Sequence, residues 1–568
     1  MPPPSAEPRP RARRDRFGWS TTSILTAIAV AVPVIMLLSS VLRPQTDMWS
    51  QQWRTRLPGE IWSTVLLLTG VAVCSTILGV GLAWLVSAYR FPGSRTFGWL
   101  LILPLAMPSY ILGYLTIATG GRTGPIQNQW RDWFGRDAWF PDLQSMGGAI
   151  LTFSLVLYPY VYLLARAALR DQAAGAYVTA RSLGAGPTEA MRRVVLPLVR
   201  PAIAAGAAVV MMETLTDFAT VQYFGVDTVS VGVFRIWRGT YDRDAASELA
   251  LVVLMFAVLA IGLERIGRGR ARYGQSGGAD AGLNASRLTG RKAAAATAAC
   301  TLVIVVAFAG PTLQLIVWAI AEQRSPRGTP LLDQFPTYLW NSLQLVAVTA
   351  IVCLVLATLL ANARRFGRPR VTKLATRTTA LGYAVPGPVI GMGVLLTVVA
   401  VDTALEGIGL DLPGAVATGS MLVLLYAYAI RFLAPGLAAI EAGTEQVSDE
   451  MTASARSLGA APLRTVAKVH LPLSKTALLS AGILVGVDAL KELPIVLLLR
   501  PFGFDTLPVW VYNLVSESRF QQAALPALSI IAVATVPVIF VARRLDRPSP
   551  LPSSRTADRA SAVPQEVT

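Results

Sequence analysis

Apolar runs of about twenty residues recur along the whole of this 568-residue chain. A helix of that length crosses the roughly 30 Å of hydrocarbon in a bilayer, since each residue adds about 1.5 Å. The composition agrees, because 53% of the residues are apolar, 15% are charged and the mean hydropathy is +0.52. The chain is therefore predicted to be an all-α polytopic membrane protein with twelve transmembrane helices. The twelve runs lie at 20–42, 61–88, 98–119, 147–169, 199–222, 247–263, 294–320, 340–362, 378–401, 413–434, 474–499 and 522–542.

The first run and the two ends of the chain need separate interpretation. Five arginines between Arg9 and Arg16 precede the first run, as in a signal peptide, but the run is long and lacks a convincing small-residue cleavage site. We therefore predict a retained helix. Segments 1–18 and 544–568 are rich in Pro, Ser, Arg and acids without apolar periodicity, and are predicted to be disordered tails.

The net charge of +17 makes the distribution of charges decisive, because a basic chain can bind either nucleic acid or a membrane. Segment 362–377 holds six basic residues and no acid, whereas the next loop holds Asp402, Glu406 and Asp411 and no base. Such alternation favours a lipid bilayer as the partner, and not nucleic acid. The positive-inside rule then predicts that both termini and the basic loops lie in the cytoplasm.

An internal duplication divides the chain. The segment Ala-Arg-Ser-Leu-Gly-Ala occurs at 180–185 and again at 455–460, and Leu-Pro-Leu follows each copy at the same distance, at 196–198 and 471–473. Weaker matches at a shift of 278 keep the same order. They are Pro33 with Pro311, Trp62 with Trp340 and Pro108 with Pro386.

The duplication predicts two six-helix halves, at 19–263 and 294–543. An even number of spans gives both halves the same orientation, so they form two parallel repeats related by an axis along the membrane normal. The linker 264–293 combines glycines with arginines and is predicted to be a flexible cytoplasmic joint. The transport pathway should lie between the halves.

The duplicated loop follows the fourth span of each half, on the predicted cytoplasmic side. An amphipathic stretch precedes Gly184 or Gly459, and Pro197 or Pro472, thirteen residues later, is expected to end the local helix. A helix, a glycine turn and a second short helix would form a knob that a soluble partner can grip. The alternative is a plain interhelical loop that was duplicated with everything else. The closer match of these loops than of the spans favours the coupling role.

Charged residues inside predicted spans are costly and by default mark a pathway or a buried pair. Glu213 and Asp217 in the fifth span correspond, at a shift of 275, to Asp488 and Glu492 in the eleventh. The i,i+4 spacing predicts that each pair shares one helix face, so the four carboxylates are candidates for the translocation pathway. The alternative is that they are helix-end groups that contact water or backbone, with Lys491 neutralising one of them.

Metal binding within the spans has few candidate ligands. The sole histidine, His470, lies in the second coupling loop, so no His-based intramembrane site for zinc, copper or nickel is expected. Hard oxygen ligands suit a hard cation, or line a polar path for a solute that is never tightly bound. The identity of any metal ligands stays open.

The coupling loops resemble those of permeases of binding-protein-dependent ABC importers. The signature of that family is Glu-Ala-Ala, three residues, Gly, nine residues, Ile-x-Leu-Pro. Both copies keep the spacing, but Val178 and Ala453 stand where the family has Glu. The resemblance implies that the grip on the partner depends on shape more than on a charge pair. The residues that it assigns to the coupling loops are Ala180, Gly184, Leu196, Pro197, Ala455, Gly459, Leu471 and Pro472.

A finer resemblance points to the fused two-half permeases of ferric-iron importers, and it covers almost the whole chain apart from the tails and linker. The segments that carry it are 213–218, 223–228, 491–494 and 499–506. The resemblance implies two ATP-binding subunits at the cytoplasmic loops, an extracytoplasmic solute-binding protein and a place in the bacterial inner membrane. Relatives of that architecture also carry thiamine, polyamines or phosphonates.

No enzymatic activity or cofactor is expected in this chain. The sequence has no phosphate-binding Gly-x-x-x-x-Gly-Lys-Ser/Thr loop, and Gly-Lys never occurs, so ATP would be used by the partner subunits. The rival class is a secondary transporter with two six-helix halves, which would need no ATPase. A membrane-embedded enzyme is a second rival, but the carboxylates have no His or Ser partner for catalysis.

Overall fold

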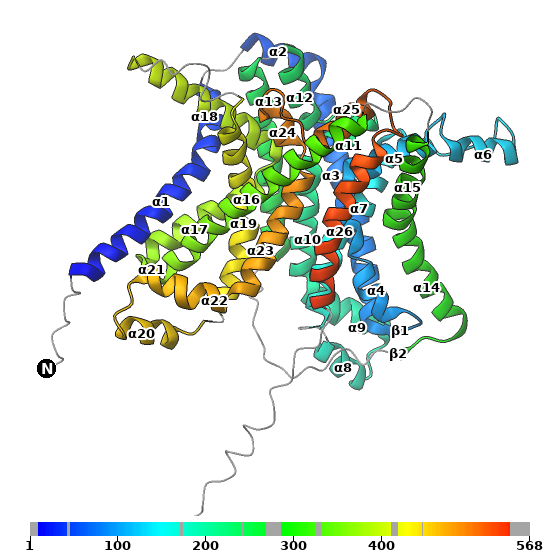
Figure 1. Ribbon diagram of the computed structural model, residues 1–568. Coiled ribbons are helices and arrows are strands. Elements are labelled where there is room, and N and C mark those ends of the chain that lie inside the picture. The colour runs from blue at the N-terminus through cyan, green and yellow to red at the C-terminus, as the bar shows by residue number, and fades with distance from the viewer. Residues whose placement is uncertain are drawn as a thin grey trace, which may run out of the picture.

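The computed structural model describes residues 10–42, 46–170, 174–240, 242–268, 286–324, 331–409, 419–445 and 447–545. This part of the chain is almost entirely helical (Figure 1). In the first half the elements are α1 (Pro10–Ser39), η1 (Ser40–Leu42), α2 (Thr46–Thr55), α3 (Leu57–Ala88), β1 (Tyr89–Arg90), α4 (Ser94–Leu100), η2 (Leu103–Ala106), α5 (Ser109–Gly120), α6 (Pro125–Phe134), α7 (Met146–Ala168), α8 (Ala174–Ser182), α9 (Pro187–Ala190), η4 (Met191–Val195), α10 (Leu196–Thr216), α11 (Phe218–Tyr223), α12 (Val229–Thr240) and α13 (Arg243–Arg268).

The second half repeats this order. Its elements are β2 (Ser286–Arg287), α14 (Gly290–Ile304), η5 (Val305–Ala309), α15 (Gly310–Gln323), α16 (Leu331–Phe366), α17 (Pro369–Ala384), α18 (Gly387–Gly407), α19 (Met421–Thr444), α20 (Asp449–Ser457), α21 (Pro462–Thr465), η6 (Val466–His470), α22 (Leu471–Leu473), α23 (Lys475–Lys491), α24 (Pro494–Leu499), α25 (Leu507–Ser516) and α26 (Ala524–Leu545).

Within the described residues, nine helices are long and apolar enough to cross a membrane, and two bent helix pairs raise the number to eleven. The twelfth predicted span corresponds to α26, whose described apolar part, Ala524–Phe540, falls below the length required of a span. The all-α polytopic fold is confirmed. The number twelve stays a prediction.

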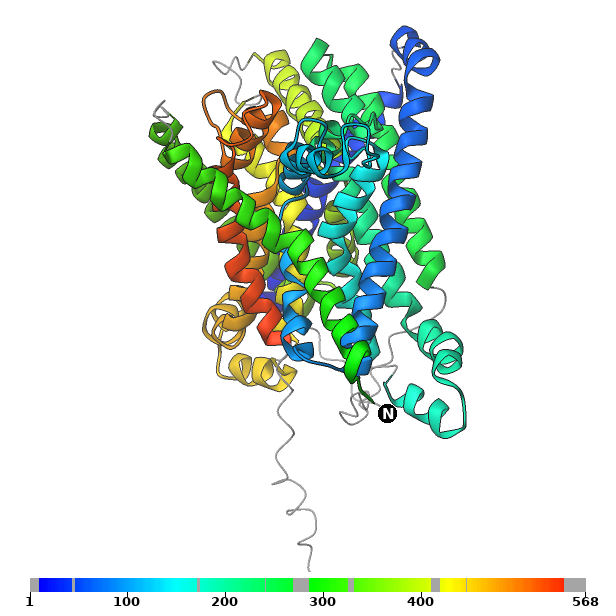
Figure 2. The same ribbon diagram turned by 90° about the vertical axis from the view of Figure 1, so that its right-hand side faces the viewer.

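The core of each half is a group of long helices. In the first half α3 packs against α7 and α10, and α10 also contacts α13; in the second half α16 packs against α19 and α23. Buried apolar side chains from both halves form one continuous hydrophobic cluster. The two halves are therefore built alike and pack together as one bundle (Figures 1 and 2).

Helix α1 packs mainly against the other half. It lies along α16, α17 and α18. Glycine permits this close approach, because a Cβ atom at Gly393 would lie only 2.5 Å from the Pro33 carbonyl oxygen. In the second half, α15 packs against α26 and α14 contacts α4 of the first half. The first apolar segment of each half thus reaches the opposite half.

Two predicted irregular segments are partly ordered. Helix α1 begins at Pro10, so the prediction that all of 1–18 is disordered is wrong for residues 10–18. Once a helix is nucleated each further residue adds a hydrogen bond, and the arginines of this segment are good helix formers. In the linker, α13 continues to Arg268 and β2 pairs in parallel with β1. The rest of these predictions fall on residues 1–9, 269–285 and 546–568, which lie outside the described residues.

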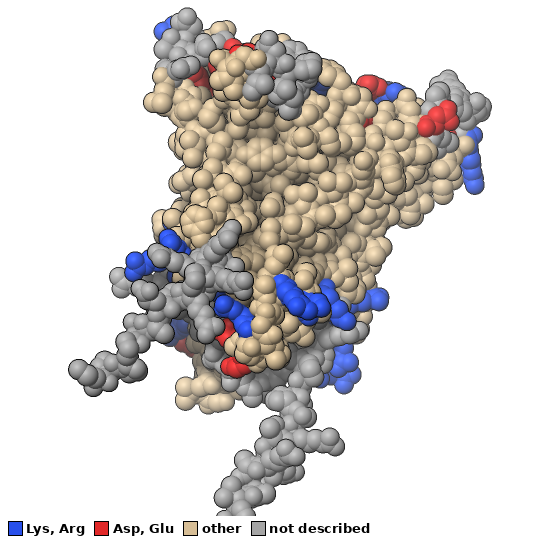
Figure 3. Space-filling view, turned by 60° about the vertical axis from the view of Figure 1, so that its left-hand side comes forward, with Lys and Arg blue, Asp and Glu red and all other residues tan. Residues whose placement is uncertain are grey.

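The surface separates into charged ends and an uncharged belt. Figure 3 shows a broad band of uncharged residues, with Lys and Arg gathered toward the lower end. In Figure 1 the duplicated loops, α8 with α9 and α20 with α21 and α22, lie at that lower end. The other end carries α2, α6 and α12. A belt of this kind is what a bilayer requires of the surface it contacts.

Candidate functional site

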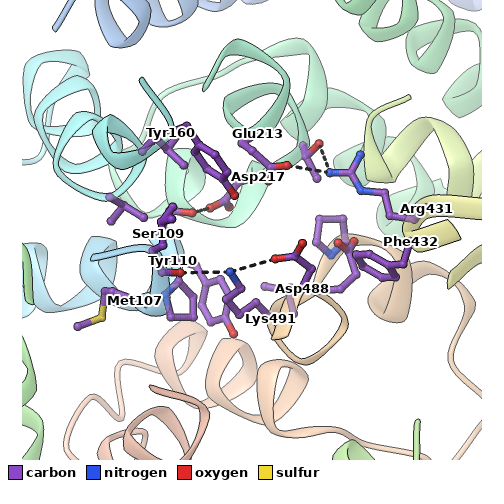
Figure 4. A pocket seen from close by; sticks show the side chains of 18 of the residues that line it. Met107, Ser109, Tyr110, Tyr160, Glu213, Asp217, Arg431, Phe432, Asp488 and Lys491 are labelled. Atoms are coloured by element: carbon purple, nitrogen blue, oxygen red, sulfur yellow. Dashed lines mark hydrogen bonds and ion pairs between the residues drawn. The ribbon is translucent and has the colours of Figure 1, made fainter. Parts of the chain in front are cut away.

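A small cavity of about 90 Å³ lies between the two halves. It is found where α10 gives way to α11 and where α23 gives way to α24, and residues of η2, α5, α7, α17 and α19 complete its wall. Its volume equals roughly three water molecules. All four carboxylates singled out in the sequence, Glu213, Asp217, Asp488 and Glu492, line this cavity. Figure 4 labels the first three.

Two of these carboxylates cap short helices. Asp217 accepts hydrogen bonds from the backbone N–H of Thr220 at 2.9 Å and from the hydroxyls of Thr220 and Ser109. Glu492 accepts one from the backbone N–H of Ile495 at 3.2 Å. A carboxylate here satisfies an N–H group that the first turn of a helix leaves unpaired. Asp217 and Glu492 therefore hold the two helix breaks in equivalent positions.

The expected i,i+4 face is wrong, because neither helix continues through its second carboxylate. Helix α10 ends at Thr216 and α23 ends at Lys491, and the residues that follow have extended backbone, with ψ of 91° at Asp217 and 120° at Glu492. Asp favours capping positions over helix interiors, and Pro494 removes an N–H that a continuous α23 would need. The carboxylates share a cavity and not a helix face.

The other two carboxylates pair with cations. Arg431 lies 3.5 Å from Glu213 across the boundary between the halves, and Tyr383 donates a hydrogen bond to Glu213 at 3.3 Å. Lys491 lies 3.3 Å from Asp488 on its own helix and donates to the carbonyl of Leu105, in the first half, at 3.2 Å. Both groups thus tie one half to the other (Figure 4).

Arg431 is the main residue that the sequence reasoning missed. It is buried on α19 and donates to the Val385 carbonyl at 2.7 Å and to the Thr216 hydroxyl at 3.2 Å, besides pairing with Glu213. The signal was present, because Arg431 is the one charged residue in the apolar stretch 421–440. A charge placed there is costly unless it is paired.

The cavity is polar but is not a prepared metal site. Among the described residues no group of three or more His, Cys, Asp or Glu side chains is placed to hold a metal ion. Four acids and two bases line the cavity, which gives a formal charge of −2 when all are ionised. The arrangement forms a narrow, acidic constriction between two helix breaks.

The predicted helix, glycine turn and second helix are present in both coupling loops. Gly184 and Gly459 have φ of +91° and +83°, which other residues rarely adopt. The N–H of the following alanine bonds back to the carbonyl of Ala180 or Ala455 at 3.1 Å, which completes a glycine-capped helix end. This turn projects Leu183 and Leu458 outward, 83% and 87% exposed.

The Leu-Pro segments behave differently in the two halves. The expectation that Pro197 ends the local helix is wrong, because the helix runs without a break from Met191 to Thr216. The π turn η4 precedes this proline and shifts the hydrogen-bond pattern by one residue. In the second half the helix ends just after Pro472, and α23 then leaves at 81°. Leu196 and both prolines are exposed, and Leu471 is half-buried.

The two loops are also anchored by different chemistry. In the first half Trp84 of α3 and Tyr177 of α8 meet edge to face, with ring centres 5.5 Å apart. Asn362 and Thr452 stand at the corresponding positions of the second half, and the buried His470 lies between them. The His470 Nδ1 lies 2.5 Å from the Asn362 Oδ1, and its Nε2 lies 3.1 Å from the Thr452 Oγ1.

Burial and a neighbouring cation decide the charge state of His470. The Asn362 oxygen can only accept, so Nδ1 carries a proton, and in the neutral ring Nε2 accepts from the Thr452 hydroxyl. Burial and the nearby Arg365 guanidinium lower the pKa of His470. Arg365 also donates to the Thr444 carbonyl at 2.6 Å. The neutral imidazole is therefore part of the anchor.

The end opposite the coupling loops carries two matching segments, 224–228 and 502–506, which both read Phe-Gly-x-Asp-Thr and lie 278 residues apart. Gly225 and Gly503 make turns with positive φ, and the Asp that follows each Gly forms an ion pair, Asp227 with Arg235 and Asp505 with Arg500. The preceding phenylalanines differ. Phe224 is buried, whereas Phe502 is fully exposed.

The two-half bundle, the cavity between its halves and the paired loops define a membrane permease. Residues 75–267 and 353–548 each match the family described as binding-protein-dependent transport system inner membrane component, and together they make up more than half of the chain. The chain belongs to this family. It is a multi-pass inner-membrane ABC importer permease in which both halves are fused in one polypeptide, so the resemblance seen in the sequence is confirmed.

Several curated relatives are similar to this chain. The Fe(3+)-transport system permease protein FbpB 2 of Haemophilus influenzae is 23% identical over 93% of this chain and 98% of its own length. The molybdenum transport system permease protein ModB of Escherichia coli strain K12 is 28% identical over 37% of this chain and 96% of its own. The sulfate transport system permease protein CysT of Salmonella typhimurium is 26% identical over 44% and 92%.

Proposed function

We propose that this permease forms the translocation pathway of an ATP-driven importer of ferric iron. Two ATP-binding subunits engage the coupling loops, an extracytoplasmic solute-binding protein delivers the cargo at the opposite end, and the halves rock to open the cavity to each side in turn. The chain itself hydrolyses no ATP and needs no cofactor. Both termini lie in the cytoplasm with the coupling loops.

The observation that carries the cargo proposal is the extent of the match to the Fe(3+) permease. That relative aligns over 93% of this chain and 98% of itself, so it shares the fused two-half architecture. The molybdenum and sulfate permeases align over 96% and 92% of themselves but under half of this chain. The whole chain, and not one half of it, therefore corresponds to the iron permease.

The charge of the cavity supports the same assignment. Molybdate and sulfate are anions, and a constriction lined by four carboxyl groups and two cations disfavours them. Ferric iron, a hard cation, suits carboxylate and hydroxyl oxygens. Because each carboxylate already has a hydrogen-bond or ion-pair partner, the cavity offers weak and transient contacts, which suits passage better than storage.

The shape of the coupling loops supports the partner assignment. Leu183 and Leu458 are exposed at the tips of two rigid turns at the same end of the bundle, and exposed apolar residues of this kind mark protein contacts. The Lys and Arg side chains at that end support its placement in the cytoplasm.

Transport in proteoliposomes tests the proposal. The permease is reconstituted with its ATP-binding subunits and solute-binding protein, and uptake of radioactive ferric iron, molybdate and sulfate is compared with and without ATP. Iron uptake that requires ATP is expected. Uptake of an oxyanion in place of iron would contradict the cargo, and uptake driven by an ion gradient without ATP would contradict the class.

A glycine pair in one loop tests the coupling role. Gly184→Ala places a side chain at φ +91°, which costs about 1–2 kcal/mol and deforms the turn. Gly186→Ala, two residues away, is the matched control, because Gly186 has no positive φ and a Cβ there meets nothing within 4 Å. Only Gly184→Ala should reduce transport and ATPase stimulation. Equal activity of the two variants would remove the turn from the coupling mechanism.

A further inference from the structure

A second pocket, of about 560 Å³, lies far from the carboxylate cavity, where α3, the start of α4 and the end of α7 meet. In Figure 1 these segments reach the same end of the bundle as α8 and α9. Four arginines line it: Arg90, Arg95, Arg166 and Arg170. No acid is among its lining residues in the part of the chain that the structure describes. Nothing in the transport mechanism above uses this pocket.

The arginines occupy two levels. Arg166 is buried, donates to the Gly98 carbonyl at 2.7 Å and lies 5.8 Å from the centre of the Tyr162 ring, so its guanidinium is held in place. Arg90 and Arg95 are exposed, and neither guanidinium has a hydrogen bond or ion pair to a described residue. One fixed cation, Arg166, and two adaptable ones, Arg90 and Arg95, therefore face one space.

The rest of the lining fits an oxygen-rich anion with an apolar neighbour. The hydroxyl-bearing residues Ser94 and Thr96 border the pocket, and so do Val86 and Phe91. Guanidinium groups donate paired N–H groups that match two oxygens of a phosphate group. Basic pockets between membrane helices at the cytoplasmic surface bind phospholipid headgroups in this way.

The second half does not reproduce this arrangement, although its sequence has a similar loop. Arg365, which corresponds to Arg90, donates to the carbonyls of Thr444 and Val447 at 2.6 and 2.8 Å and so supports its own coupling loop. Arg364 pairs with Glu441. Arg364 and Arg365 of that loop are thus engaged within the protein, whereas Arg90 and Arg95 of the first half line an open pocket.

We propose that the pocket formed by Arg90, Arg95, Arg166 and Arg170 binds a phosphate group, carried by an anionic phospholipid or by a soluble phosphate compound. The buried Arg166 fixes the position of the phosphate, and the exposed Arg90 and Arg95 close around it. Beside the first coupling loop, such a ligand would hold the ends of α3 and α7 together.

Lipid binding to the purified full-length permease tests the site. Native mass spectrometry measures the occupancy of short-chain phosphatidylglycerol, with phosphatidylcholine as the uncharged comparison. The double variant Arg90→Gln, Arg95→Gln should bind phosphatidylglycerol roughly 25-fold more weakly, since each arginine near the membrane surface contributes about fivefold. Both side chains are exposed, so folding should not change, which gel filtration checks.

The matched control is Arg368→Gln with Arg370→Gln, which removes the same charge from exposed positions in the corresponding loop of the second half. Loss of binding in the first double variant alone supports the site. Inorganic phosphate is added as a competitor: displacement of the lipid identifies a soluble phosphate as a ligand, and failure to displace it identifies the lipid headgroup. Equal loss in both double variants, or unchanged binding in the first, would overturn the proposal.

Discussion

The contact of Arg431 with Glu213 gives the sharpest test of how the halves are held together. The Arg431 side chain is only 4% exposed and lies 3.5 Å from Glu213, on the other half. Coulomb's law with an effective dielectric constant near 20 gives about 5 kcal/mol at this distance before desolvation. Arg431→Met removes this attraction and the bonds to Val385 and Thr216, so we expect a loss of about 3–5 kcal/mol in the free energy of unfolding.

Thermal unfolding of the purified protein in detergent ranks the variants. Glu213→Gln added to Arg431→Met should recover part of the loss, because the remaining carboxylate is then neutral. The control is Arg364→Met, which breaks a shorter ion pair of 2.8 Å to Glu441. Because the Arg364 side chain is 47% exposed, we expect this variant to lose only about 0–1 kcal/mol in the free energy of unfolding. If Arg364→Met destabilises as much as Arg431→Met, the reasoning from burial is refuted.

Two further predictions concern the loop anchor and the packing of the first half. Because the pKa of His470 is lowered, the stability that it contributes is complete above about pH 6.5 and is lost as the pH falls toward the folded value. The hydrogen-exchange protection of 449–474, corrected for the intrinsic exchange rate at each pH, should therefore decrease from pH 7 to pH 5, and His470→Gln should abolish that decrease. Gly79→Leu places a Cβ 2.8 Å from the Val161 Cβ and should lower the free energy of unfolding by about 1–3 kcal/mol, measured by thermal unfolding. Gly81→Leu is the control, because a Cβ at Gly81 meets nothing within 4 Å, and it should cost less. Equal losses in the two variants would contradict the packing of α3 against α7.

The helical segments could be located from the sequence because hydrophobic length is a local property. The apolar runs predicted the bounds of α3 and α7 within about four residues, but those of α16 and α19 only within about ten, because the ends of these two helices are less apolar than their middles. The glycine of each coupling loop predicted its turn. The crossing of α1 to the other half could not be predicted, because it depends on long-range packing against α18 that no local pattern contains.

The site was partly predictable for the same reason. A shift of 275 residues brought Glu213 and Asp217 into register with Asp488 and Glu492, and all four line one cavity. The carboxylate spacing suggested continuous helices, which was wrong. The break at Asp217 could not be predicted, because Asp217 is held by Thr220 and by Ser109, and Ser109 is remote in sequence. Arg431 was overlooked because its partner Glu213 lies in the other half.

The crossing of α1 has a consequence for the order of events during synthesis. Its main neighbours begin at Leu331, roughly 290 residues after Ser39. At about 5–20 residues per second, about 15–60 s pass between the emergence of α1 and that of its docking surface. During that time the helix has only lipid and the first half beside it, and it must stay apart from other chains. Assembly of this permease therefore cannot finish half by half, because its first helix is among the last to find its place.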